Sequence, residues 1–186
     1  ALQAERHRLE LGEDSIPPPP FHRALDARVD RAGAPLCQLV EFRESVNRGQ
    51  RAGLEAALQA SGLLDAWITP DGVLHALDKS GQPLLDTQWL ARPQQPQSLA
   101  QWLTTSEPLD SLKTTVPAAT VQRLLEGVAC SAVDDSEAET WVSADGGFRL
   151  GALAGSWSKP AAEYVGFVAR AAARVRRLVE ITLRQS

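Results

Sequence analysis

A long helix near the C-terminal end constrains this fold more than any other feature of the sequence. Residues 160–184 contain no helix-breaking residue after Pro160 except Gly166. At 1.5 Å per residue such a helix would extend about 36 Å. That is longer than a domain of this size can cover. We therefore expect the helix to project from the rest of the chain.

The apolar residues of this helix recur at steps of three and four, which is typical of a coiled-coil seam. With two leucines from the start of the chain, the predicted seam comprises Leu2, Leu9, Val168, Ala171, Val175, Leu178 and Thr182. The arginines of the helix are predicted to lie on the opposite face, at Arg170, Arg174, Arg177 and Arg184. Guanidinium groups in such a row could neutralise the phosphates of double-stranded DNA. The alternative is an exposed arginine face that contributes only solubility and weak ion pairs.

The first residues are also predicted to be helical. Residues 1–13 are rich in helix formers, and Gly12 followed by Asp14 and Ser15 supplies a stop. We interpret this segment as an incoming coiled-coil helix and residues 159–186 as the outgoing one, pairing antiparallel. The chain starts at Ala1 and contains no Met, so we expect it to be a piece of a longer protein. The predicted arrangement is a globule at the tip of a coiled-coil arm.

Between the helices we predict a proline-rich connector over residues 14–35 and a globular domain over residues 36–158. With 44% hydrophobic and 23% charged residues, the chain has an ordinary globular composition. The order of apolar runs and turn signals predicts a mixed α/β (α+β) fold. Its predicted elements are strands at LCQLVEF, LLDAWIT and VLHAL, helices at 50–60 and in ATVQRLLEGVA, one or two helical turns at SLAQWL, and two strands around residues 144–147. Prolines divide residues 80–115 into short pieces, and no role is assigned to them.

No catalytic residues, metal site or cofactor are predicted. His7, His22 and His75 have no partners at metal-ligand spacing, and hydrolase, metalloprotease and dinucleotide motifs are absent. Cys37 and Cys130 are expected to be buried free thiols. The acidic run at 134–139 is expected to be a solvated loop. No apolar run is long enough to cross a bilayer, so we expect a cytoplasmic protein without membrane contact.

Several phrases of the sequence resemble one family. ERHRLELGEDSIPPPPFHR, GAPLCQLVEFRE, AGLEAALQASGLLDAWITPDG and GSWSKPAAEYVG resemble the central region of SMC-like, condensin-related ATPases of the bacterial Wadjet plasmid-defence class. The similar segments lie within residues 1–72 and 146–180. The resemblance implies a globular hinge that joins two arms as a homodimer, with other subunits of a condensin-like complex and a nucleoid association. The resemblance also implies that the ATPase site of the parent lies elsewhere, and we expect this part not to be an enzyme. In agreement, the chain has no phosphate-binding loop of the Walker type, so we do not expect it to bind ATP through such a site.

The resemblance also suggests a dimer surface built from glycine-rich strands. Its candidates here are Gly146, Gly147, Gly151 and Gly155. The alternative for the first two is a simple hairpin turn, because Asp145-Gly146 is a strong hairpin signal. Two other functions remain open: a monomeric structural insertion in a coiled coil, and an inserted ligand-binding or enzymatic domain.

Overall fold

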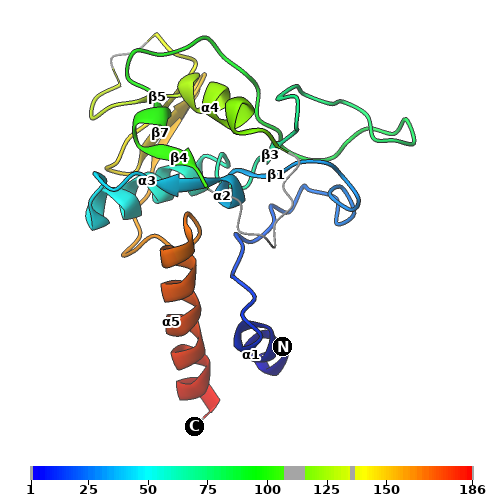
Figure 1. Cartoon of the computed structure of the whole chain (residues 1–186), viewed down its shortest axis with the longest axis vertical. Coiled ribbons are helices and arrows are strands. Elements are labelled where there is room, and N and C mark those ends of the chain that lie inside the picture. The colour runs from blue at the N-terminus through cyan, green and yellow to red at the C-terminus, as the bar shows by residue number, and fades with distance from the viewer. Residues whose placement is uncertain (1, 107–115, 135–136, 186) are drawn as a thin grey trace.

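The computed structural model describes residues 2–106, 116–134 and 137–185. Residues 107–115 of the middle segment and part of the acidic run, residues 135–136, therefore lie outside the description. The fold is a mixed α/β arrangement with small sheets, and the prediction is confirmed at that level. Figure 1 shows a globule from which one long helix and one short helix extend on the same side.

Within the described residues the strands form three sheets. β1 (Ala34–Pro35) pairs antiparallel with β3 (Trp67–Ile68), and β2 (Val40–Phe42) pairs antiparallel with β4 (Leu103–Thr105). The third sheet has the order β5-β6-β7-β8 and is antiparallel except for its β5–β6 pair. Its strands are β5 (Ala129–Cys130), β6 (Thr140–Val142), β7 (Gly147–Leu150) and β8 (Leu153–Ser156). β8 is therefore an edge strand.

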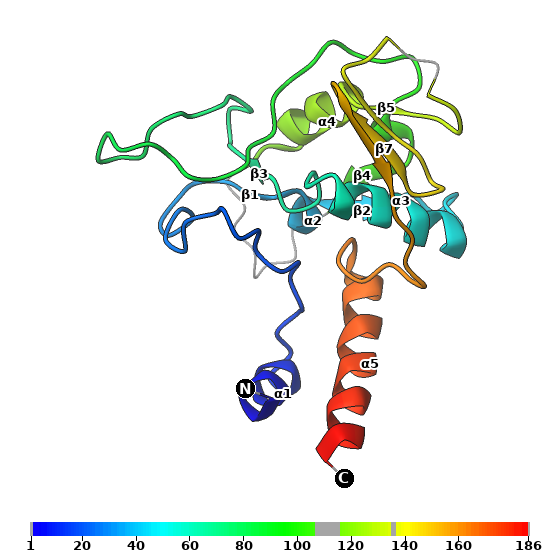
Figure 2. The same cartoon turned by 180° about the vertical axis from the view of Figure 1, so that it is seen from behind.

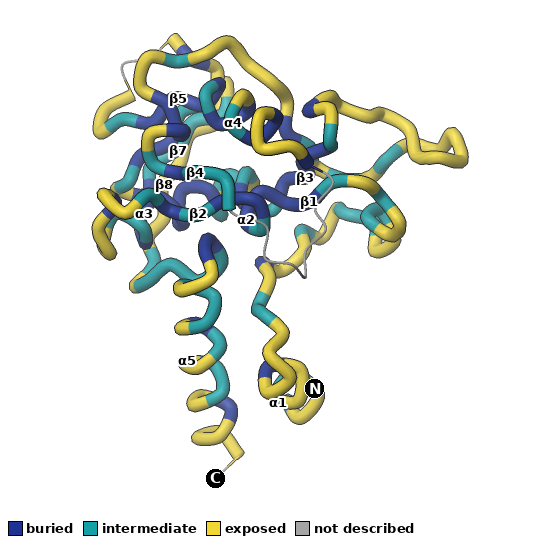
Figure 3. Tube along the Cα trace, in the orientation of Figure 1, coloured by how far each residue is buried: buried dark blue, intermediate teal, exposed yellow. Residues whose placement is uncertain are grey.

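Two helices close the core. α3 (Arg48–Ala60) begins at a capping box, in which the Asn47 side chain accepts from the Gln50 amide and the Gln50 side chain accepts from the Asn47 amide. α4 (Ala118–Glu126) begins after Pro117, where the first helical turn needs no amide donor. Their apolar faces join the strands in one buried cluster, whose fully enclosed members include Leu36, Val40, Leu54, Leu58, Ile68, Leu99, Leu103 and Leu125. Figure 3 shows this buried centre above the terminal helices, whose residues are mostly exposed or half-buried.

Three predicted elements differ from the structure. LCQLVEF is not one strand, because α2 (Leu36–Leu39) precedes β2. VLHAL is not a strand either: after the turn at 69–72 the chain makes only isolated bridges, and these apolar side chains are mostly exposed. By contrast, SLAQWL forms a single turn of 3-10 helix, Leu99–Gln101, as predicted. The outgoing helix α5 (Phe167–Gln185) starts seven residues after Pro160, because Gly166 has a φ of +90° that interrupts the helix.

Both terminal helices lie below the globule in the views of Figures 1 and 2. α1 (Leu2–Glu10) lies beside α5 and makes more contacts with it than with any other helix or strand. In these views α5 is seen from the side and α1 nearly end-on. The two helices therefore cross, and α1 does not run along α5 as the predicted antiparallel pair would.

Candidate functional site

The contact between the two chain ends is the first candidate site. Glu5 accepts from Nε of Arg177 at 2.7 Å and from Nη2 at 3.0 Å. Asp14, which follows α1, accepts from Arg170 at 3.0 Å and from Arg174 at 3.1 Å. The hydrogen bond from Arg177 lowers the pKa of Glu5. Together these pairs hold the N-terminal segment against α5.

This arrangement corrects the predicted seam. Val168 and Val175 are 74% and 60% exposed, and Thr182 is also exposed, so these residues are not in the helix contact. Ala171 and Leu178 are half-buried, as is Leu2. The predicted seam residue that is buried is Leu9, and sequence reasoning missed Ile181, which is completely buried.

The arginines do lie opposite Val168 and Val175 on α5, as predicted, but the arginine face is the one that meets the N-terminal segment. Arg170, Arg174 and Arg177 lie toward the N-terminal segment instead of away from it, whereas Arg184 is exposed. The periodicity of α5 identified two faces correctly but not which face meets the partner. α1 presents few apolar side chains, so the carboxylates beside it attract the charged face of α5.

A second feature fixes the point where α5 leaves the globule. Glu55 on α3 is completely buried, and its carboxylate accepts from the backbone amides of Glu163, Tyr164 and Val165 at 2.6, 3.0 and 2.8 Å. The ammonium of Lys159, whose side chain is 4% exposed, donates to the same carboxylate at 2.7 Å. Burial of these charges is tolerated because each is paired and hydrogen-bonded.

A further carboxylate holds the first residue of the helix. Glu41 on β2 accepts from the amide of Phe167 at 2.9 Å, which satisfies one free donor at the N-terminus of α5. A side chain at Gly166 would overlap this carboxylate. We call residues 158–167 with Glu41 and Glu55 the arm joint. It ties α5 to β2 and α3 of the core.

The four candidate glycines all belong to the β6–β8 hairpins. Side chains at Gly146 and Gly155 would overlap the carbonyl of Trp157 and the ring of Phe148. Gly147 packs closely against Trp141, and Gly151 occupies the turn between β7 and β8 with a φ of +55°. Packing within the sheet thus explains why Gly146, Gly147 and Gly155 lack side chains. Their role in a dimer stays a prediction.

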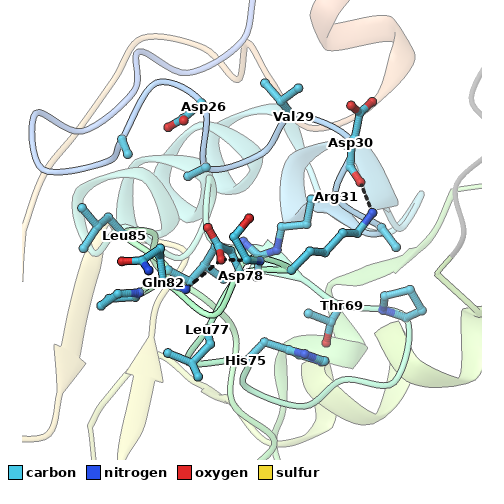
Figure 4. Close-up of a pocket in the computed structure, with 18 of the residues that line it drawn as sticks. Asp26, Val29, Asp30, Arg31, Thr69, His75, Leu77, Asp78, Gln82 and Leu85 are labelled. Carbon is cyan, nitrogen blue, oxygen red and sulfur yellow. Dashed lines mark hydrogen bonds between the residues drawn. The ribbon is translucent and has the colours of Figure 1, made fainter.

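A cavity of about 720 Å³ lies between the connector and the loop after β3. Residues 24–32 form one wall and residues 69–85 form the other, and Figure 4 shows Val29 and Asp30 on the first wall and His75 and Leu77 on the second. Sequence reasoning did not predict this cavity, because neither wall has the periodicity of a helix or strand.

One aspartate of the cavity is strongly acidic. The hydroxyl of Thr69 and the amide of Val73 donate to Asp71, and His75 lies 3.3 Å from it; these contacts lower the pKa of Asp71 to about 2. Asp71 is therefore charged at neutral pH. The lining of the cavity thus contains a histidine paired with a charged carboxylate.

The remaining predicted features are placed as follows. Cys37 and Cys130 are buried free thiols, as expected, and burial raises the pKa of each to about 12. The described residues contain no group of three or more His, Cys, Asp or Glu arranged to hold a metal ion. Every helix in that part of the chain is too short or too polar to cross a membrane.

Comparison with known proteins adds no relative: no family model, no curated protein and no solved structure matches this chain.

Proposed function

We propose that this chain is the hinge module of an SMC-like, condensin-related ATPase of the Wadjet type, where it joins two coiled-coil arms as a homodimer. The observation that carries the proposal is the contact between α1 and α5 on one side of the globule. Two chain ends that leave a domain together are what a domain at the tip of an arm requires. The nine residues of α1 cross α5, so the antiparallel coiled coil would form from longer arms.

The arm joint supports this function. A hinge passes movement of the arms to the globule, which requires a stiff attachment. The carboxylate of Glu55 accepts from three successive backbone amides, and that of Glu41 accepts from the amide of Phe167 at the start of α5. Because Glu55 lies within α3, a tilt of α5 would act directly on the core.

The exposed face of α5 also supports packing of further helices. Besides Phe167 at its first position, α5 has four large apolar side chains that are more than half exposed: Val168, Val175, Val179 and Leu183. At 100° per residue they share one stripe on the side opposite to the arginine pairs. A free-standing surface helix seldom exposes such a stripe, whereas helices of a coiled-coil arm bury one.

The edge strand β8 is the surface on which we propose that two copies meet. All four of its residues are exposed, and it contains neither a charged residue nor a proline that would block strand addition. Leu150 and Leu153 flank the two-residue turn and form a hydrogen-bonded pair between β7 and β8. Hydrogen-bonded and non-hydrogen-bonded pairs alternate along an antiparallel pair of strands, so the backbone N–H and C=O groups of Ala154 and Ser156 point away from β7. Antiparallel pairing of β8 with β8 of a second copy would satisfy these groups with two-fold symmetry.

The oligomeric state tests the proposal. We expect sedimentation equilibrium of the whole chain at micromolar concentration to give about twice its mass of 20.1 kDa. Ala154→Lys places like charges across the symmetric pair and should give a monomer, whereas Ala119→Lys on the exposed surface of α4 should stay dimeric. A wild-type chain that is monomeric would favour the alternative of a structural insertion. A dimer that survives Ala154→Lys would exclude β8 as its surface.

Contact with duplex DNA through the arginine face remains part of this proposal. Phosphates would have to compete with Asp14 and Glu5 for Arg170, Arg174 and Arg177. A gel shift measured against salt concentration, repeated with Arg174→Glu and Arg177→Glu, tests it. Unchanged binding in both variants would remove the arginine face from the DNA site. Association with other condensin-like subunits and a cytoplasmic, nucleoid-associated location follow from the same proposal.

A further inference from the structure

Hydrogen bonds between residues 24–32 and residues 69–85 fix the two walls of the cavity relative to each other. The amide of Ala24 donates to the carbonyl of Leu85 at 3.1 Å, and the ammonium of Lys79 donates to the carbonyl of Asp30 at 3.1 Å. These links join the walls at two separate places. The space of about 720 Å³ between them is therefore part of the folded structure, and its size is typical of small-molecule sites.

The connector wall is fixed to the globule by arginines. Arg28 binds Asp86 through two nitrogens, at 2.8 and 2.9 Å, and also reaches Asp65 at 3.1 Å. Its guanidinium lies 5.0 Å from the ring centre of Trp67, whose indole N–H donates to the carbonyl of Ala32. Asp86 has a completely buried side chain and also pairs with Arg31. Ordering of the wall before a ligand arrives lowers the entropic cost of binding.

The walls offer apolar surface. The lining includes alanines, leucines, a valine and prolines, contributed by both walls. Val29, Leu77 and Leu85 are each more than half exposed although they border the cavity. Covering these side chains would gain roughly 25 cal/mol for each Å² of apolar surface removed from water. The cavity therefore suits a ligand with an apolar body.

The charges of the lining favour a cation. Four carboxylates line the cavity: Asp26, Asp30, Asp71 and Asp78. The cationic side chains of the lining are Lys79 and Arg31, and Arg31 shares the buried Asp86 with Arg28. An anion would meet an excess of carboxylates, whereas an ammonium group would be attracted to them.

We propose that this cavity binds a small organic cation with an apolar body, the ammonium facing the aspartates and the apolar part lying against Val29, Leu77 and Leu85. This site is separate from the hinge function proposed above. It lies on the connector side of the globule, and neither the arm joint nor β8 contributes to its lining.

Three probes with one apolar body and different head groups test the proposal: phenylbutylamine, phenylbutanol and phenylbutyrate. We expect NMR titration of the whole chain to show amide shifts within residues 24–32 and 69–85. The amine should bind about tenfold more tightly than the carboxylate, with the alcohol between them, and added salt should reduce the difference. Equal affinities for amine and carboxylate, shifts confined to other segments, or no shifts at millimolar amine would overturn it.

Variants separate the charge from the apolar contact. Asp71→Asn and Asp78→Asn each retain an oxygen that can accept the local amide hydrogen bonds, and each should weaken the amine severalfold but not the alcohol. Asp145→Asn, outside the cavity lining, is the matched control and should change neither. Leu77→Ser should weaken all three probes. An amine affinity that is unchanged in both cavity aspartate variants would refute the assignment.

Discussion

Replacement of Glu55 by Gln is the sharpest test of the arm joint. The substitution keeps the shape of the side chain but removes its charge. The Glu55 carboxylate accepts three backbone amides and one ammonium, and it has no exposed surface through which water could substitute. In Gln one of the two oxygens becomes an NH2 group. This hydrogen-bond donor then faces at least one of the amide or ammonium donors that the carboxylate accepted from.

The size of the effect follows from what is left behind. Removal of one partner from a buried ion pair costs about 3–5 kcal/mol, because the other charge stays buried and unpaired. Lys159 keeps two other partners, since Gln59 lies at 2.9 Å and Glu163 at 3.0 Å from its ammonium. We therefore expect Glu55→Gln to lower the free energy of unfolding by about 3 kcal/mol, near the lower end of that range.

Urea denaturation followed by tryptophan fluorescence measures this loss. The matched control is Glu44→Gln, at an exposed glutamate just beyond β2, where a change of at most about 0.5 kcal/mol is expected. Hydrogen exchange supplies a local measurement: the amides of Glu163, Tyr164 and Val165 should exchange faster in Glu55→Gln than in the control. A loss below about 1 kcal/mol with unchanged exchange at these amides would show that the arm joint does not depend on this carboxylate.

Three further predictions concern separate parts of the chain. Burial raises the pKa of Cys37 and Cys130 to about 12, so iodoacetamide at pH 8 should label neither thiol until urea is added, which mass spectrometry would show. The free energy of unfolding should also fall as the pH rises above about 9, because the thiols ionise in the unfolded chain but not in the folded one. The pKa of Glu5 is lowered by the α5 guanidinium, so its stabilising contribution should be present above about pH 4.3 and be lost as the pH falls further, a loss that Glu5→Gln should abolish in acid titrations of α1 amide exchange. Gly146→Ala should cost more than Gly151→Ala in thermal melts, because both glycines have positive φ but only the first is enclosed, and equal losses would contradict this.

Local signals in the sequence predicted the globule better than the site. The helix predicted at 50–60 is α3, extended by two residues at its start because Asn47 caps it. The hairpin signal at Asp145-Gly146 lies between β6 and β7 as expected. These elements depend on a few neighbouring residues, and so their signals are present in any short window.

The candidate sites depend on residues that are distant in the sequence. Glu55 and Lys159 are 104 positions apart, and the visible sign of their pairing was a glutamate inside the apolar run of α3. Likewise, the acidic residues at 5 and 14 and the arginine spacing 170, 174 and 177 suggest a charged helix contact only when both ends are placed together. Periodicity shows that a helix has an apolar face and a charged face, but which face makes the contact depends on the residues of the segment that packs against it.

The choice of face on α5 has a consequence for the proposed arms. If the apolar stripe had met α1, the exposed side of α5 would carry arginines and would suit solvent. Instead, charge pairs occupy the contact with α1, and Val168, Val175, Val179 and Leu183 are left exposed. Partly exposed ion pairs such as these stabilise a contact less than burial of an apolar stripe does. A helix that pairs its charges within the chain and exposes its apolar stripe to solvent is better suited to pack against another helix than to remain in solvent.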